Sequence, residues 1–287
     1  MYNYPASTQY IYLNGVLEGS RSSNPYQGMN GSIIIGSADN GTMFYFTGRI
    51  DQVSLITEAK SANEILDDAT LVCHFSFDSD PYADSGPLNL TGSGVNFTAT
   101  VGNGVINDAI SFAVASSYYV VGGLYKLGLV NQPYSISLWI NPTSVNGGTI
   151  AHVSRCNYSC TGFWCLAFIG LTSSGQIAIQ SWRSFSSNLV SLTGPTAPIN
   201  AWTHVVETYS PTNGMCLYIN GSLVNQSSTF AYAAGSAPNY IYLGSFPWTV
   251  CVGTNTIASG QYHGLLDEFR IYSREITATE VYTLSQI

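Results

Sequence analysis

The chain has 287 residues, of which 45% are hydrophobic and only 8% are charged, and its formal net charge at pH 7 is −8. Globular proteins carry about 25% charged residues, so the surface of this one must consist mostly of Ser, Thr, Asn, Gly and Tyr. Nucleic acids and anionic membranes attract basic patches, and the acidic balance argues against both as partners. The longest apolar stretches are as short as strands and are interrupted by Gly, Ser and Thr, which predicts no membrane span.

Short segments of alternating polar and apolar residues dominate the chain. Residues 135–140 and 176–180 alternate with a period of two and are bounded by Gly, Pro, Asn or Ser. Asn-Gly pairs favour the positive φ angles of tight hairpin turns, and they occur at Asn14-Gly15, Asn213-Gly214 and Asn220-Gly221. The pattern predicts an all-β sandwich or jelly roll with very little helix.

The C-terminal part of the chain repeats its beginning. Residues 10–17, 33–37 and 48–53 return, in the same order, at 216–223, 241–245 and 264–269. A capping box follows each copy, at Ser61–Glu64 and at Thr277–Glu280, and predicts one short helix after the last strand. The spacing predicts a complete domain at 67–287 and, at 1–66, only the C-terminal third of a second copy, so that the chain starts inside a domain. The junction lacks a Pro/Gly-rich spacer, which favours close packing over a flexible tether.

Several of these segments together resemble a known family. The segment Trp202-Thr203-His204-Val205-Val206 precedes 217–221, and 134–140 and 264–272 supply a central and a closing strand. Phe75-Ser76-Phe77-Asp78 supplies an opening strand. In this order they resemble the laminin-G-like, concanavalin A-like jelly-roll domains over 71–287, while 1–66 resembles the last third of such a domain. The resemblance implies a jelly-roll sandwich of two antiparallel sheets, preceded by a partial copy of the same domain.

Six cysteines and seven Asn-x-Ser/Thr sites indicate an oxidising, secretory environment. We expect all six cysteines to form disulfides, with a pairing that the sequence does not select: Cys73, Cys156, Cys160, Cys165, Cys216 and Cys251. A zinc site at the clustered cysteines is disfavoured, because a second Cys-x2-Cys pair is missing. N-linked glycans are predicted at Asn30, Asn40, Asn89, Asn96, Asn157, Asn220 and Asn225, although the Asn220 side chain is also expected to serve the hairpin turn.

Two further groups of residues are candidate ligand sites. Asp78, Asp80 and Asp84 lie in one loop after a strand, where carboxylates supply the oxygen ligands of Ca²⁺. The resemblance implies such a calcium at the sandwich rim, whereas the alternative is that these residues form local turns. Trp248 lies in a loop that is longer than its counterpart in the first copy, and it is either a platform for sugar rings or a side chain packed on the sandwich edge.

The sequence offers weak support for catalysis. His204 lies on a predicted strand beside Trp202, and no nucleophile elbow accompanies it. Some concanavalin-like sandwiches are glycoside hydrolases, which place two carboxylates on either side of a sugar bond. Asp267 and Glu268 are adjacent on a strand and are expected to face opposite sides. We therefore expect a protein that is not an enzyme.

Two functions remain open at this stage. The first is a secreted structural glycoprotein, the repeat unit of an extracellular tandem array or of a self-assembling fibre built from laminin-G-like domains. Its partners would be further copies or adjacent domains of the same longer chain, because strands without their own sheet expose edges and apolar faces. The alternative is a lectin-like adhesion module that binds carbohydrate or protein.

Overall fold

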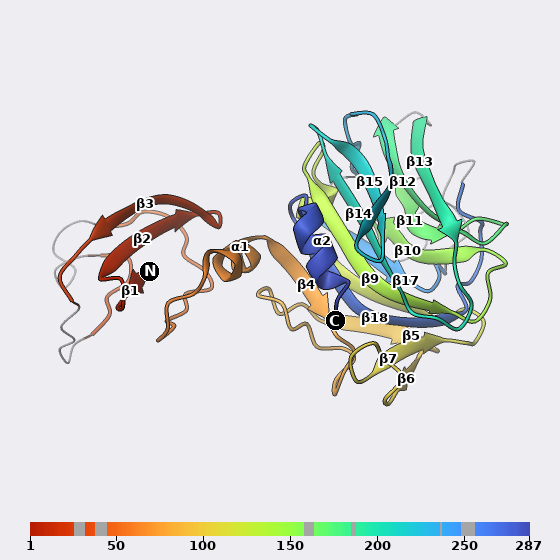
Figure 1. Cartoon of the computed structure of the whole chain (residues 1–287), viewed down its shortest axis with the longest axis horizontal. Helices are drawn as coiled ribbons and strands as arrows, with labels where there is room; N and C mark the ends of the chain where they lie inside the picture. The colour runs from red at the N-terminus through yellow and green to blue at the C-terminus, as the bar shows by residue number, and fades with distance from the viewer. Residues whose placement is uncertain (26–31, 38–44, 158–163, 185–187, 236, 248–255) are drawn as a thin grey trace. The chain divides into compact units, whose positions relative to one another are not determined.

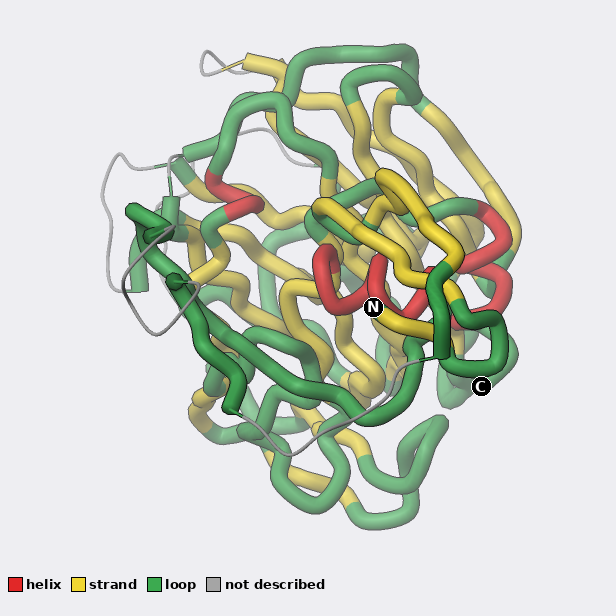
Figure 2. The backbone as a smooth tube through the Cα atoms, turned by 90° about the vertical axis from the view of Figure 1, so that its left-hand side faces the viewer, coloured by secondary structure: helices red, strands yellow, loops and turns green. Residues whose placement is uncertain are grey.

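The computed structural model describes residues 1–25, 32–37, 45–157, 164–184, 188–235, 237–247 and 256–287. The chain divides into two compact units, residues 1–69 (unit 1) and residues 70–287 (unit 2). Strands make up most of the regular structure, and helix is confined to short segments (Figure 2).

Unit 2 is a sandwich of two antiparallel sheets (Figure 1). The seven-stranded sheet has the order β13 (Asn188–Thr196), β12 (Gln176–Ser184), β11 (Cys165–Leu171), β10 (Gly148–Ser154), β17 (Asn239–Leu243), β8 (Tyr118–Leu124) and β5 (Gly92–Val95). The eight-stranded sheet has the order β16 (Ser222–Gln226), β15 (Gly214–Ile219), β14 (Thr203–Ser210), β9 (Tyr134–Pro142), β18 (Gly264–Tyr272), β7 (Ala109–Phe112) and β6 (Thr98–Thr100), and β4 (Leu71–Phe75) pairs with β18.

One large apolar core lies between the two sheets. Strand residues alternate between this core and the outer faces, because successive side chains of a strand point to opposite sides. On β8, for example, Tyr119 and Val121 are fully buried in the core, whereas Tyr118 and Val120 are only partly buried. The sequence of β9 alternates as predicted, yet all of its side chains except Asn141 are buried, since it lies in the middle of its sheet.

A second, smaller core covers the outer face of the eight-stranded sheet. The helix α2 (Ala278–Leu284) buries Val281 against side chains from β14, β15 and β18. The predicted capping box is present: Glu280 N donates to Thr277 Oγ1, and Thr277 N donates to Glu280 Oε2. The cap fixes where α2 begins and thereby which side chains it presents to the sheet.

Unit 1 contains a three-stranded antiparallel sheet and one helix. The strands β1 (Tyr2–Asn3), β2 (Thr8–Leu13) and β3 (Val16–Ser22) pair in chain order, and α1 (Ala62–Thr70) follows. Residues 33–37 and 50–56 are described and do not form strands.

The all-β jelly-roll prediction is confirmed, whereas the prediction that every cysteine forms a disulfide is wrong. Cys156 and Cys165 are each disulfide-bonded. Cys73 and Cys216 are free thiols. Cys73 is buried in the large core between the sheets, and Cys216 is buried in the smaller core beneath α2. Burial raises the pKa of each of these thiols, so both stay protonated and unreactive in the folded protein. Cys160 and Cys251 lie outside the described residues.

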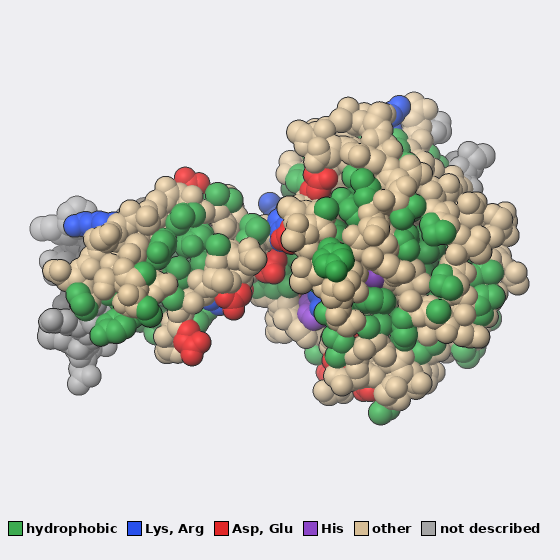
Figure 3. All heavy atoms as spheres, viewed as in Figure 1, with side chains coloured by type: hydrophobic (Ala, Val, Ile, Leu, Met, Phe, Trp, Pro, Cys, Tyr) green, Lys and Arg blue, Asp and Glu red, His purple; other side chains and the backbone are tan. Residues whose placement is uncertain are grey.

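Charged side chains are sparse on the surface, as the composition requires (Figure 3). Among the helices that the structure describes, none has the length and apolar character needed to cross a bilayer.

Candidate functional site

A groove of about 260 Å³ lies on the outer face of the seven-stranded sheet of unit 2. The strands β5, β8 and β17 form its floor. Asn157, three residues after the end of β10, contributes to its wall. The lining residues are Thr91, Ser93, Tyr118, Val120, Gly122, Asn157, Tyr240 and Tyr242. The lining residues on β8 and β17 alternate with the core residues of those strands, whereas Thr91 and Asn157 lie just outside strands.

Aromatic rings dominate the groove. The Tyr118 and Tyr242 ring centroids are 5.8 Å apart, and the Tyr242 ring meets the Phe246 ring edge to face at 5.1 Å. Phe246 in turn stacks on the His152 imidazole, with centroids 3.9 Å apart. Such contacts restrict rotation of the Tyr118 and Tyr242 rings. Tyr242 is itself buried, so the ring surface that the groove offers comes from the half-buried Tyr118 and Tyr240.

A glycine makes room for one of these rings. A Cβ atom on Gly122 would lie 2.7 Å from Cε1 of Tyr240, closer than real contacts allow. The absence of a side chain on β8 at this point lets the Tyr240 ring lie across the neighbouring strand. The signal was available in the sequence, because Tyr240 and Tyr242 alternate with Ile241 and Leu243, but their meeting with β8 depends on strand order.

The groove carries no formal charge among the lining residues that the structure describes. Its polar groups are the hydroxyls of Thr91 and Ser93, the tyrosine phenols and the amide of Asn157. Nearby, burial lowers the pKa of His152 to about 3, so this imidazole is neutral at physiological pH. The site therefore suits a neutral ligand with an apolar face and several hydroxyl groups.

The three aspartates predicted to bind calcium do not come together as a cluster of metal ligands in the structure. No cluster of three potential ligands occurs among the described residues, which include all three aspartates. Both oxygens of Asp84 accept backbone N–H groups, from His74 and Gly86 at 2.7 Å and from Leu90 at 2.8 Å. Asp80 accepts from Tyr82 N and Asp78 accepts from Asp108 N. The carboxylates order the loop backbone, which was the alternative interpretation.

The remaining predicted sites are dispersed. Trp248, Asn30 and Asn40 lie outside the described residues. Asn89, Asn96, Asn157 and Asn220 are exposed. Asn220 Oδ1 accepts a hydrogen bond from His204 N, and Asn225 Nδ2, the atom that would carry a glycan, donates to Thr193 O.

His204 has a structural environment. Its side chain is buried, and its Nε2 lies 2.9 Å from Ser137 Oγ. Burial, assisted by the nearby Arg270 charge, lowers its pKa to about 3. Ser137 is also fully buried, so a substrate has no access to this pair.

Asp267 and Glu268 do not alternate simply, because β18 contains a bulge there and Glu268 has a φ of 52°. Asp267 Oδ2 accepts backbone N–H groups from Val105 and Ile106, and burial raises the pKa of Asp267 to about 7. Burial favours a raised pKa for Glu268 as well, but the hydrogen bond from His74 and the charge of Arg270 lower it. Both carboxyl groups are buried and serve the fold.

The chain belongs to the Concanavalin A-like lectin/glucanases superfamily, whose family pattern matches residues 1–66 and 114–282. No curated protein matches the sequence significantly. Solved structures share the fold over about three quarters of the chain at low sequence identity.

One such structure is the binding domain of botulinum neurotoxin serotype G, with 16% identity and a TM-score of 0.54, covering 75% of this chain and 50% of that one. The binding domain of Paraclostridial Mosquitocidal Protein 1 has 18% identity and a TM-score of 0.53, covering 76% and 52%. Domain 4 of AbnA, a GH43 extracellular arabinanase from Geobacillus stearothermophilus, in complex with arabinotriose, has 21% identity and a TM-score of 0.49, covering 75% and 98%. The match thus spans about half the length of the first two of these binding domains.

Proposed function

We propose that unit 2 is a carbohydrate-binding module that holds a neutral glycan in the groove formed by β5, β8 and β17. The observation that carries the proposal is an uncharged groove whose lining combines the half-buried rings of Tyr118 and Tyr240 with side chains that have hydroxyl and amide groups. Sugar rings have an apolar face and a hydroxyl-rich edge, and such an amphipathic surface matches both. Membership of a superfamily of lectins and glucanases supports this chemistry.

The size of the groove indicates what part of a ligand it takes. Pockets for whole small molecules measure about 300–1,000 Å³, and this groove has about 260 Å³. It suits a short segment of a longer chain lying across the sheet. We propose that the module binds glycans without hydrolysing them. Asp267 and Glu268, the described carboxyl groups that most resemble an acid/base pair, are buried and already engaged in backbone and side-chain hydrogen bonds.

The module would act outside the cell. The disulfide bonds of Cys156 and Cys165 favour an oxidising compartment, and the exposed sequons at Asn89 and Asn96 are positioned for N-glycans. The sequon at Asn157 lines the groove itself. A glycan attached there would compete with a bound ligand, so we expect binding to require that this site is unmodified.

The test is a glycan array followed by calorimetry with the ligand that the array identifies. Tyr240→Ala and Tyr118→Ala should each weaken binding by about two- to tenfold, because each removes a ring face worth about 0.5–1.5 kcal/mol. Tyr125→Ala is the matched control, since Tyr125 is 63% exposed and is not part of the groove. Equal glycan affinity of the Tyr240→Ala and Tyr125→Ala variants would contradict the proposal that the groove binds the glycan. Loss of binding in Trp248→Ala alone would place the site in the loop instead.

A structural role as the repeat unit of an extracellular array or fibre is a second proposal. It is favoured by the apolar side chains that unit 1 exposes, among them Ile11, Leu13 and Leu55. Light scattering of the purified chain over a range of concentrations tests it. Mass that grows with concentration supports assembly, and a constant monomer mass at high concentration contradicts it.

A further inference from the structure

Unit 1 reproduces the hairpin at the start of the last third of unit 2. In both hairpins the strand register shifts at the same point, between Ile11 and Tyr12 in unit 1 and between Leu217 and Tyr218 in unit 2. The turn glycines also match: Gly15 has a φ of 82° and Gly221 a φ of 78°. A Cβ on Gly15 would meet the Cα of Leu66 at 2.8 Å, just as one on Gly221 would meet the Cα of Tyr282, at 3.1 Å. The hairpin and the helix thus approach each other at equivalent positions in both units.

The closing segment is reproduced as well. Gln52 has a φ of 48°, and its N–H donates to Asp51 Oδ1. Its equivalent, Glu268, has a φ of 52°, and its N–H donates to Asp267 Oδ1. The helix cap is repeated, because Ser61 and Glu64 exchange the hydrogen bonds that Thr277 and Glu280 exchange. A backbone hydrogen bond also recurs, from Phe46 to Gly36 and from Tyr262 to Gly244. Local sequence therefore dictates the same local geometry twice.

The burial of the equivalent side chains differs completely. In unit 2 the inward-facing residues of this third are at most 9% exposed, and they are Leu217, Ile219, Ile241, Leu243, Leu266, Phe269 and Ile271. Their equivalents in unit 1 are 49–77% exposed, and they are Ile11, Leu13, Ile33, Ile35, Ile50, Val53 and Leu55. We call these seven residues the open face of unit 1. An apolar surface of this kind marks an interaction site.

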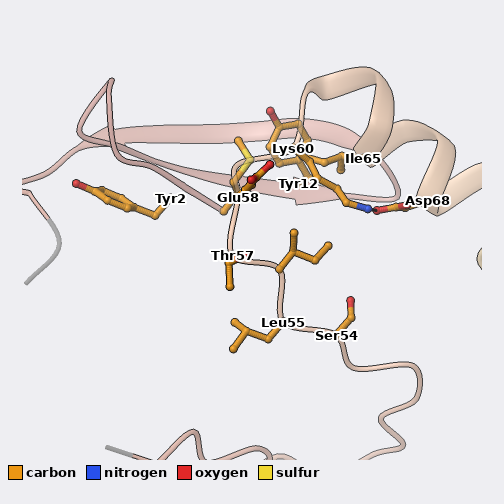
Figure 4. A pocket seen from close by; sticks show the side chains of 11 residues that line it. Tyr2, Tyr12, Ser54, Leu55, Thr57, Glu58, Lys60, Ile65 and Asp68 are labelled. Carbon is orange, nitrogen blue, oxygen red and sulfur yellow. Dashed lines mark hydrogen bonds and ion pairs between the residues drawn. The ribbon is translucent and has the colours of Figure 1, made fainter. Parts of the chain in front are cut away.

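A cavity in unit 1 lies beside the strand and helix that are equivalent to β15 and α2. It measures about 650 Å³ and lies between β2, the segment 54–58 and α1, with Tyr12, Leu55 and Ile65 in its wall (Figure 4). In unit 2 the equivalent strands, β15 and β18, are separated by β14 and β9. The cavity thus lies at the place that two strands fill in unit 2.

We propose that the open face of unit 1 docks a jelly-roll body, meaning a segment of the same family that supplies the strands equivalent to β4 through β14 and lacks its own last third. Two strands equivalent to β9 and β14 would enter the cavity of unit 1. The strand equivalent to β14 would pair with the edge of β2 beyond the short contact that β1 makes with Thr8 and Gln9. The seven open-face residues would then lie in the core that the two sheets enclose.

A whole second copy of this chain fits the surface less well. The body of its unit 2 is already covered by its own β15, β17 and β18, so docking would first have to displace these strands. A face-to-face pair of two open faces would hide apolar side chains but would leave the strand edges in the cavity unpaired. Both arrangements are distinguished from the proposal by the experiment.

The experiment adds a body to the complete chain. Gln9 and Met215 occupy equivalent positions of the two hairpins, and their strand partners are Tyr2 and Tyr209. Tyr2 is therefore equivalent to Tyr209, and Met1 is equivalent to Thr208. A second copy of residues 71–207 is therefore placed directly before Met1. Hydrogen–deuterium exchange of the backbone amides then reports on 11–13, 33–35 and 50–55. We expect exchange there to slow by about a hundredfold or more, and the added body to resist protease.

Two variants of the extended chain provide matched controls. Leu13→Asp combined with Ile35→Asp should abolish the protection, because both side chains would enter the core. Leu17→Asp should leave it intact, because Leu17 is 48% exposed and its equivalent in unit 2, Leu223, is also 51% exposed. Exchange in residues 70–287 of the original unit 2 must be unchanged in every sample, which shows that the rest of the chain folds.

Three outcomes would overturn the proposal. In the first, the added body stays sensitive to protease and the amides of the open face exchange rapidly. In the second, Leu17→Asp removes the protection as completely as the double variant does. In the third, the chain without an added body protects its open face by forming a concentration-dependent dimer. The last result would assign the surface to a second copy. None of them bears on glycan binding by unit 2, which the Tyr240 variants test separately.

Discussion

The phenol of Tyr134 donates a 2.7 Å hydrogen bond to Oε1 of Glu207 in the interior of unit 2. The Tyr134 oxygen also lies 3.3 Å from Ser181 Oγ on the opposite sheet, so this polar group connects the two layers of the sandwich. Glu207 is fully buried, and its second oxygen has no partner in the described part of the chain. Burial raises the pKa of Glu207 well above its ordinary value, which keeps the carboxyl group protonated in the folded state.

This relationship predicts a pH dependence of stability. A carboxyl group whose pKa is raised in the folded state stabilises the fold below the unfolded pKa of 4.5, and that contribution is lost as pH rises toward the folded pKa. Glu207→Gln is uncharged at every pH, so its stability relative to the native protein should increase by about 1.4 kcal/mol for each pH unit within this window. Urea unfolding at pH 4.5, 6 and 7.5 measures the difference. A difference that does not change with pH would contradict a buried neutral carboxyl group.

A second prediction concerns the glycine beneath Tyr240. Gly122→Ala places a methyl group where Cε1 of Tyr240 now lies 2.7 Å away, so the ring has to move. The ring end of a half-buried side chain shifts at small cost, and we expect a change in stability of less than about 1 kcal/mol. Glycan affinity, measured by calorimetry, should fall several-fold. Gly19→Ala is the control, since its Cβ would meet nothing within 4 Å, and an equal affinity of the two variants would show that the position of Tyr240 is irrelevant.

The aspartate loop gives a third prediction. Asp84→Ala leaves the N–H groups of His74, Gly86 and Leu90 without their acceptor and should destabilise the protein by about 2–4 kcal/mol. Asp80→Ala removes one exposed hydrogen bond, to Tyr82, and should cost about 0.5 kcal/mol or less. Thermal unfolding with EDTA and with added calcium should give the same Tm for the native protein. A rise in Tm with calcium that Asp84→Ala abolishes would restore the calcium site.

The fourth prediction concerns the cysteines. Cys73 and Cys216 are buried free thiols whose pKa is raised, so an alkylating reagent should label them only after unfolding in urea without reductant. Cys156 and Cys165 should be labelled only after reduction. Mass spectrometry of the labelled peptides identifies each position. Labelling of Cys156 before reduction, or of Cys73 in the folded protein, would contradict the assignment.

Local features of the fold were readable from the sequence because they depend on neighbouring residues. The Asn220-Gly221 turn and the Thr277–Glu280 capping box form as predicted, since each involves contacts over three or four residues. The buried strand 134–140 was recognised from its alternation. Their order along the chain also indicated the superfamily, which the family match confirms.

The roles of individual side chains depended on distant partners and were predicted less well. Six cysteines and an oxidising compartment suggested disulfides throughout, but Cys73 and Cys216 lie in different cores and cannot meet. Spacing suggested metal ligands at Asp78, Asp80 and Asp84, but three backbone N–H groups from two sides of the loop occupy Asp84. The groove was missed because its tyrosines come from β8 and β17, which are neighbours only in the folded sheet.

The sequence by itself determined the repeat, the jelly-roll class and the local features that recur in both units, namely the hairpin, its turn and the helix cap, because these depend on residues close together in the chain. Tertiary structure decided which copies of those segments are covered. Leu243 and Ile35 occupy equivalent positions, yet one is fully buried and the other is 55% exposed. The reason is physical: burial belongs to the pair of surfaces that meet, and in unit 2 the strands of the body provide the second surface.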